Sequence, residues 1–123
     1  MSDGPQPQRH EEYPRHMLDA IEKVARYTAG LDKSAFLPDE KTQDAAVRNL
    51  EFVEEASRRI LEECPEFAQR HPEVPCKRIY AMRNRLSHGY IEVDLDVVWD
   101  AIRQSLPELE QHARQILANS GKA

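Results

Sequence analysis

The chain has 123 residues, a mass of 14.2 kDa and a formal net charge of −5 at pH 7. This length supports one hydrophobic core at most, since two cores would each be too small to be stable. Its 40% hydrophobic and 32% charged residues, four glycines and two cysteines exclude the collagen-like and disulfide-scaffold classes. No apolar run approaches the roughly 20 residues of a transmembrane helix, and the N-terminus lacks the apolar stretch of a secretory signal. We therefore expect a cytoplasmic protein that makes no contact with a membrane.

The spacing of apolar residues predicts helices through most of the chain. Residues 1–12 combine Gly, Pro, Gln and charge without periodicity, which is typical of a flexible tail. Apolar residues then recur every three or four positions from 14 to 30 and again from 38 to 64, which predicts two helices, the second being the longest. Residues 65–75 contain three prolines, so we expect a loop there with about one helical turn.

A third helix is predicted from Pro75 to His88, where Gly89 can adopt the left-handed conformation that ends helices. A last helical segment starts after Asp94 or Asp96, either of which can act as its N-cap. Pro107 is expected to kink this segment or divide it in two, because proline removes a backbone donor. The sequence YIEVDL alternates for a few residues and is the one short strand signal.

These elements predict an all-α protein. Their short connections make sequential helices neighbours, so we expect an antiparallel bundle of four or five helices. The expected domain organisation is a flexible tail at residues 1–12, a single helical domain at residues 13–118 and a C-terminal tail at residues 119–123.

Positive charge is concentrated in residues 75–91, PCKRIYAMRNRLSHGYI, which contain no carboxylate and four cations, Lys77, Arg78, Arg83 and Arg85. The other 106 residues contain 13 basic and 22 acidic side chains. A basic segment inside an acidic protein favours a local anion site over a nonspecific nucleic-acid coat. Any contact with a polynucleotide is therefore expected to be short.

On an ideal helix at ~100° per residue, one polar stripe contains Lys77, Tyr80, Asn84 and His88. Arg83 falls between this stripe and the apolar face, where a guanidinium needs an anionic partner or a protein interface. Arg83 and His88 lie about 140° apart on a continuous helix. They converge only if the helix ends near His88 or if a second copy supplies one of them. The alternative interpretation is that basic residues and histidine simply offset the dipole at the end of a helix.

The segment RNRLSHGY, residues 83–90, fits the pattern Arg, four residues, His, one residue, Tyr. It resembles the signature of HepT-like ribonuclease toxins of the HEPN superfamily, which belong to type VII toxin–antitoxin systems of the HepT/MntA type. Three flanking segments are also similar to that family: EKTQDAAVRNLEFVEEASRRI, VPCKRIYAMRN and DLDVVWDAIRQSLPEL. The resemblance extends from about Met17 to Gln115.

This resemblance implies a HEPN-like bundle that forms a twofold homodimer and cleaves RNA in the shared cleft without a metal or another cofactor. The catalytic arginine and histidine of the motif correspond to Arg83 and His88, and Asn84 corresponds to a positioning residue. In an isologous dimer each motif occurs twice, so Arg83 of one subunit can lie near His88 of the other. Further residues expected to bind or position the RNA are Lys77, Tyr80 and Arg85.

Tyr90 matches the motif tyrosine that, in toxin pairs of this type, a minimal nucleotidyltransferase antitoxin modifies with AMP. The resemblance therefore implies such an antitoxin as a partner, with an adenylyl phosphodiester beside Arg83 and His88. One alternative is a noncatalytic helical subunit that holds a nucleotide or presents a substrate to a nucleotidyltransferase. It would depend on Arg83 and Lys77 and tolerate loss of His88. Another is a structural bundle with an accidental motif.

Other candidate sites are weaker. Cys64, His71 and Cys76 flank the proline-rich loop but offer only three zinc ligands without paired-cysteine spacing, so we expect buried or loop thiols. His112 and the two histidines near the N-terminus are expected to be solvated. The acidic residues of the second helix are interpreted as a solvated face; they are Glu51, Glu54, Glu55, Glu62 and Glu63.

Overall fold

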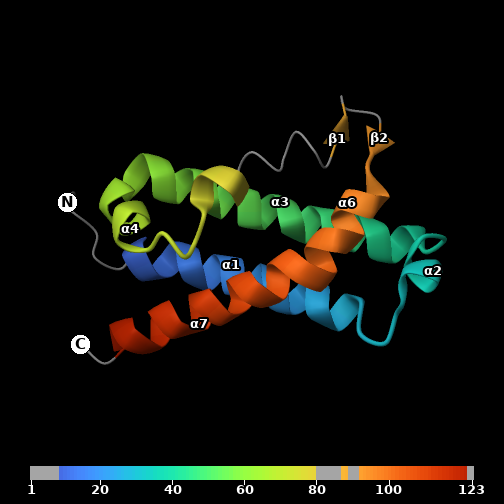
Figure 1. Ribbon diagram of the computed structural model, residues 1–123, viewed down its shortest axis with the longest axis horizontal. Helices are drawn as coiled ribbons and strands as arrows, with labels where there is room; N and C mark the ends of the chain where they lie inside the picture. Colours follow the sequence, from blue (N-terminus) through green and yellow to red (C-terminus); the bar gives the residue numbers. More distant parts are fainter. Residues whose placement is uncertain (1–8, 80–86, 89–91, 122–123) are drawn as a thin grey trace, which may run out of the picture.

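The computed structural model describes residues 9–79, 87–88 and 92–121 (Figure 1). Helices form most of these residues, which confirms the all-α prediction. None of the described helices is both long enough and apolar enough to cross a membrane. In chain order the elements are α1 (Arg9–Tyr27), α2 (Lys33–Phe36), α3 (Glu40–Glu63), α4 (Pro65–Arg70), strands β1 (Ser87–His88) and β2 (Glu92–Val93), α6 (Leu95–Asp100), the π-helical turn η1 (Ala101–Ser105) and α7 (Leu106–Gly121).

Three long helices build the core. α1 packs against both α3 and α7, and α7 ends at the same end of the molecule at which α1 begins (Figure 1). The short helix α2 lies at the opposite end. The side chains buried between the long helices recur at helical spacing, as the sequence predicted; among them are Met17, Ile21, Val24, Leu50, Val53, Ile60, Leu109 and Ile116.

α3 covers nearly the range predicted for the second helix. Asp39 is its N-cap, and the Asp39 carboxylate accepts a hydrogen bond from the backbone N–H of Thr42 at 3.1 Å. This bond satisfies one of the N–H groups that the first turn of any helix leaves without a partner. The helix ends at Glu63, because the following Cys64 precedes Pro65, which starts α4. The predicted turn within residues 65–75 is therefore the six-residue helix α4.

The start of α1 differs from the prediction. The helix begins at Arg9 and contains Pro14, although residues 1–12 were expected to be a tail. The Tyr13 hydroxyl donates a hydrogen bond to Glu63 of α3 at 2.8 Å, and only 7% of Tyr13 is exposed. These tertiary contacts stabilise the first turns enough to offset the backbone hydrogen bond that Pro14 removes.

The last segment is divided near Pro107, as predicted. Asp94 is its N-cap, with the carboxylate accepting from the backbone N–H groups of Asp96 and Val97 at 3.1 and 3.3 Å. After α6, the π-helical turn η1 widens the helix, and the N–H of Leu106 bonds the carbonyl of Ala101. A proline at 107 cannot bond the carbonyl four residues earlier and clashes with it, so the wider turn immediately before it relieves that conflict. α7 then continues to Gly121, past the predicted end of the domain at residue 118.

Candidate functional site

The basic segment enters the described structure at residues 76–79, which form a helical turn. Cys76 and Ile79 are buried in the core, whereas Lys77 and Arg78 are exposed. The two buried residues lie three positions apart, as expected for one face of a helical turn. Lys77 therefore has the exposure that RNA binding requires. The other expected site residues of the basic segment lie outside the described part of the chain: Tyr80, Arg83, Asn84 and Arg85.

The backbone at His88 is extended, which corrects the predicted third helix. Ser87 and His88 form β1, which pairs antiparallel with β2, and His88 lies opposite Glu92. The predicted helix therefore does not continue through Ser87 and His88. The physical reason is the alternating, β-branched sequence that follows the motif, which favours strand pairing over another helical turn. Tyr90 lies outside the described residues.

This pairing has a consequence for the geometry of the motif. A histidine on a continuous helix would diverge from Arg83, and an end of the helix before His88 is one of the two conditions that permit convergence. β2 leads directly into Asp94 and α6, whose Val98 and Trp99 are buried. The chain that follows His88 is thus attached to the core within a few residues.

A cavity of about 330 Å³ lies beside the start of the motif segment, between α3, residues 73–79, η1 and α7. Its floor and walls are apolar and almost fully buried; they include Leu50, Val53, Ile79 and Leu109. The residues at its mouth are exposed; they include Glu73, Arg78, Ser105 and Glu108. The cavity therefore opens to the surface, and its volume falls within the range of small-molecule pockets.

Two polar side chains lie deeper in this cavity. Glu54 is only 4% exposed, and His112 is half-buried. The His112 Nδ1 atom is buried and has no hydrogen-bond partner among the described residues. A buried polar group without a partner costs about 1–3 kcal/mol. A cavity with an apolar wall and a few polar side chains has the composition of a binding pocket.

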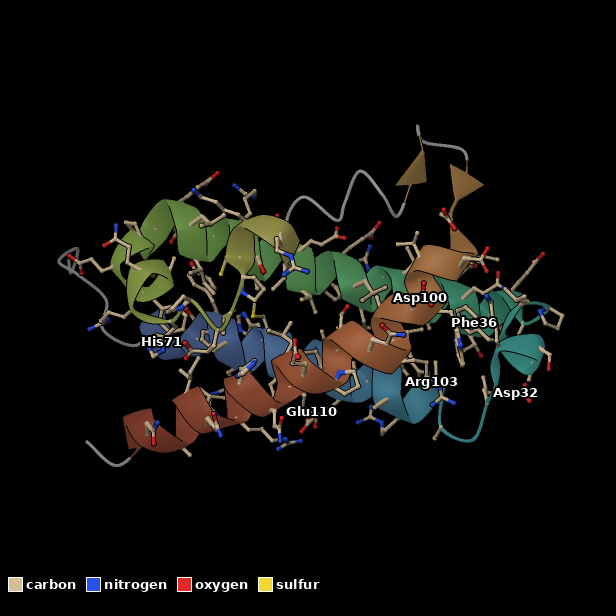
Figure 2. All side chains as sticks on the ribbon, in the orientation of Figure 1. Asp32, Phe36, His71, Asp100, Arg103 and Glu110 are labelled. Atoms are coloured by element: carbon tan, nitrogen blue, oxygen red, sulfur yellow. The ribbon has the colours of Figure 1, made fainter. Side chains whose placement is uncertain are left out.

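The carboxylate of Glu73 is anchored at the mouth of the cavity. His71, which follows α4 (Figure 2), makes a hydrogen bond from Nδ1 to Glu73 Oε2 at 3.0 Å. The pKa of Glu73 is lowered by a hydrogen bond from its own backbone N–H and further by His71. Glu73 is therefore a stable anion at neutral pH, with its side chain oriented by His71.

The two cysteines that flank residues 65–75 pack in the hydrophobic core. Cys64 and Cys76 are both buried, and burial raises the pKa of the Cys76 thiol to about 11. Thiolates are the form that binds zinc, so a neutral buried thiol suits packing instead. In the described ranges, no three or more His, Cys, Asp and Glu side chains gather in a way that could hold a metal ion.

Sequence reasoning missed the two polar residues of the cavity. Glu54 was assigned to a solvated acidic face and His112 to a solvated position, but the structure buries the first and half-buries the second. The helical spacing of α3 does indicate that Glu54 is buried. Glu54 lies four residues after Leu50 and three before buried Ser57, on the apolar stripe of α3. The rest of the predicted acidic face does include exposed ion pairs, such as Glu55 with Arg58.

The comparison with protein families gives one decisive match. The family described as Ribonuclease HepT-like matches residues 17–116, which include the motif segment and every residue of the cavity. The chain belongs to the HepT-like ribonuclease family. No solved structure matches it significantly.

Two curated relatives extend this HepT-like assignment. A protein of Thermococcus cleftensis named "Probable ribonuclease HepT" is 36% identical over 101 residues, which cover 82% of this chain and 89% of the relative. A "Putative RNase" of Caldanaerobacter subterraneus subsp. tengcongensis is 33% identical over 105 residues, covering 85% of this chain and 91% of the relative. The similarity therefore covers most of this chain and most of each relative.

Proposed function

We propose that this chain is a metal-independent endoribonuclease that acts as a homodimer and is the toxin of a toxin–antitoxin pair. The observation that carries the proposal is the HepT-like match over residues 17–116, within which the complete pattern of Arg83, His88 and Tyr90 is present. Two features of the structure support it. Lys77 and Arg78 are exposed cations at the start of the motif segment, and the backbone at His88 is extended.

In the proposed reaction the RNA supplies its own nucleophile. A neutral His88 imidazole takes the proton from a ribose 2′-hydroxyl, whose oxygen attacks the adjacent phosphorus. The bond from phosphorus to the 5′ oxygen breaks, and a protonated His88 returns a proton to that oxygen. Because a dimer contains two His88 side chains, the two proton transfers need not use the same one. The products are a 2′,3′-cyclic phosphate and a 5′-hydroxyl.

Arg83 has the electrostatic role in this scheme. Negative charge builds on the nonbridging phosphoryl oxygens during attack, and a guanidinium offers two parallel N–H donors to them. Lysine would supply a point charge without this planar geometry. Asn84, Lys77, Tyr80 and Arg85 bind or position the RNA in the proposal.

Substitution of the motif residues tests the proposal. His88→Ala and Arg83→Ala should each lower RNA cleavage by about 100-fold or more while the protein remains dimeric. The readouts are gel analysis of a labelled RNA, mass spectrometry of the cyclic phosphate, and light scattering coupled to size-exclusion chromatography. Matched controls are His16→Ala and Arg15→Ala, which remove exposed side chains of the same types on α1. Full cleavage by His88→Ala would exclude the proposed chemistry, whereas RNA binding without cleavage by the unmodified protein would favour a noncatalytic binding subunit.

The proposed antitoxin is a minimal nucleotidyltransferase that transfers AMP to Tyr90. The added phosphodiester would occupy the place of the substrate phosphate and repel RNA. Coexpression with such an enzyme should raise the intact mass by whole adenylyl units and abolish cleavage, whereas Tyr90→Phe should keep its mass. Peptide mapping that places the modification on Tyr27, which is exposed on α1, would contradict this assignment.

A further inference from the structure

A second hollow, of about 440 Å³, lies beside the first residues of the basic segment, at the end of the molecule that contains α4 (Figure 1). It is lined by the C-terminal part of α3, by α4 and by residues 72–78. Lys77 and Arg78 both border it, and Arg78 also borders the cavity at Glu73. The hollow therefore lies on the surface from which the motif segment starts.

The surface of this hollow is mainly apolar and rigid. Three prolines line it, Pro65, Pro72 and Pro75, together with Leu61 of α3 and Ala68 of α4. We call it the proline hollow. The ring of a proline fixes its own φ angle, and its side chain loses almost no rotamer freedom when a ligand covers it. A flat apolar ring can therefore be buried here at little cost in conformational entropy.

The charged side chains that line the proline hollow are all positive. Its described lining contains the cations Lys77 and Arg78 and no carboxylate, although the chain as a whole has a net charge of −5. By contrast, the cavity described above is lined by Glu73 and Glu108 as well as by Arg78. Neither Lys77 nor Arg78 forms an ion pair with another described residue, whereas exposed Arg58 is paired with glutamates of its own helix. Both cations of the proline hollow are therefore available to an anion.

Gln69 adds an amide at the rim of the proline hollow. It is exposed on α4, and its side chain offers both N–H donors and an acceptor oxygen. An RNA base presents donors and acceptors at the edge of a flat ring, and its phosphate needs cations. The proline hollow thus matches the ring, the edge and the phosphate of one nucleotide. In a duplex the bases are stacked and paired, so only an unpaired nucleotide can enter.

We propose that the proline hollow binds one unpaired nucleotide of the RNA substrate, with its base against the prolines and its phosphate on Lys77 and Arg78. The inference rests on the proposed ribonuclease function. Lys77 precedes His88 by 11 residues, so the length of the chain limits their separation to about 40 Å. A nucleotide held here tethers an unpaired strand near the proposed cleavage site. The proline hollow therefore contributes to RNA affinity and not to the chemical step.

RNA binding without cleavage tests the proline hollow directly. In the full chain carrying His88→Ala, fluorescence anisotropy is measured with a short labelled single strand and with the same sequence as a blunt duplex. Ala68→Phe keeps every charge and fills the apolar surface, so it should weaken single-strand binding about tenfold and leave duplex binding unchanged. The control is Ala118→Phe, at an exposed position on α7, which should change neither affinity. Equal loss for single strand and duplex, or loss for neither, would overturn the proposal.

A second variant covers the case in which Ala68→Phe fails to fold, as judged by its thermal melting. Gln69→Glu changes an exposed side chain at the rim and places a carboxylate beside the proposed phosphate site. It should weaken single-strand binding about fivefold at low salt. Gln111→Glu makes the same change of charge at an exposed position on α7 and should have less than about a twofold effect. Equal effects of the two variants would show that RNA senses only the net charge, and the inference would be wrong.

Cleavage kinetics separate this inference from the proposed function. With His88 intact, Ala68→Phe should raise KM for single-stranded RNA about tenfold and leave kcat unchanged. Cleavage with an unchanged KM would overturn the proline hollow and leave the ribonuclease standing. If the unmodified protein cuts no RNA but binds a single strand that Ala68→Phe releases, the ribonuclease is wrong and the proline hollow remains a nucleotide site.

Discussion

At the scale of single residues, burial changes the chemistry that the residue type alone suggests. Cys76 is a potential nucleophile and metal ligand by type, but it is 3% exposed and its thiol pKa is raised to about 11 by burial. Glu54 is a surface residue by type, yet it is buried in the wall of a cavity. Both differences depend on which face of a helix meets the core. Helical spacing indicates that face only when the position of the polar residue is compared with the positions of all the apolar residues on the same helix.

Cys76 gives a prediction at this scale. A neutral, buried thiol reacts slowly, so N-ethylmaleimide at pH 8 should modify neither Cys76 nor Cys64 in the native protein and both after denaturation. Mass spectrometry gives the count. Gln111→Cys, at an exposed position on α7, should be modified within minutes as the control. Rapid native labelling of Cys76 would show that the loop opens around it.

The same shift has a pH dependence with a defined sign. The folded pKa of Cys76, about 11, lies above its ordinary value of 9.0. The stabilisation from keeping the thiol neutral is thus complete below pH 9.0 and is lost as pH rises toward about 11. The melting temperature should fall across this range, and by less in Cys76→Ala, which has no thiol to ionise.

At the scale of elements, the sequence predicts those helix positions and helix ends that local spacing and capping residues determine. The range of α3 and the division near Pro107 follow from local signals, and the structure confirms them. The sequence offered Asp94 or Asp96 as N-cap, and the structure shows that it is Asp94. The early start of α1 depends on the contact of Tyr13 with Glu63, 50 residues away, which no local pattern contains. The extended backbone at His88 depends on pairing with β2. The roles of Arg83, His88 and Tyr90 remain predictions.

The short helix α2 provides the prediction for this scale. Phe36 is fully buried, and its ring lies 4.9 Å from that of Trp99. Phe36→Ala should lower the free energy of unfolding by about 3–5 kcal/mol, because it leaves a cavity against Trp99. Urea unfolding followed by fluorescence of Trp99, the single tryptophan of the chain, measures the change. Leu37→Ala, 41% exposed in the next position, should change stability by less than about 0.5 kcal/mol.

At the scale of the whole molecule, charge is unevenly distributed. The basic residues 75–91 lie in a chain whose net charge is −5, so only a short length of RNA can meet positive charge. Acidic surfaces elsewhere repel the rest of a polynucleotide. The proposed ribonuclease therefore depends on a short, local contact between RNA and the basic segment.

The salt dependence of RNA affinity tests whether RNA contacts only the basic segment. In a His88→Ala background, where RNA stays intact, Lys77→Ala should reduce the slope of log affinity against log salt by about 0.7 for each phosphate contact removed. Fluorescence anisotropy of a labelled single strand gives the slope. Lys41→Ala, exposed on α3 outside the basic segment, is the matched control. An equal change in both variants would mean that RNA senses only the overall charge.

The turn η1 sets the rotational phase between the two halves of the last helical segment. Its wider winding takes up one residue more than an α-helical turn, so α6 and α7 keep nearly the relative rotation of a regular helix. If the same residue were wound as regular α-helix, it would instead rotate α6 by about 100° against α7. That rotation would move Trp99 away from Phe36 and displace β2, the strand that pairs with His88. The π-helical turn therefore keeps the chain that follows the motif in register with the core.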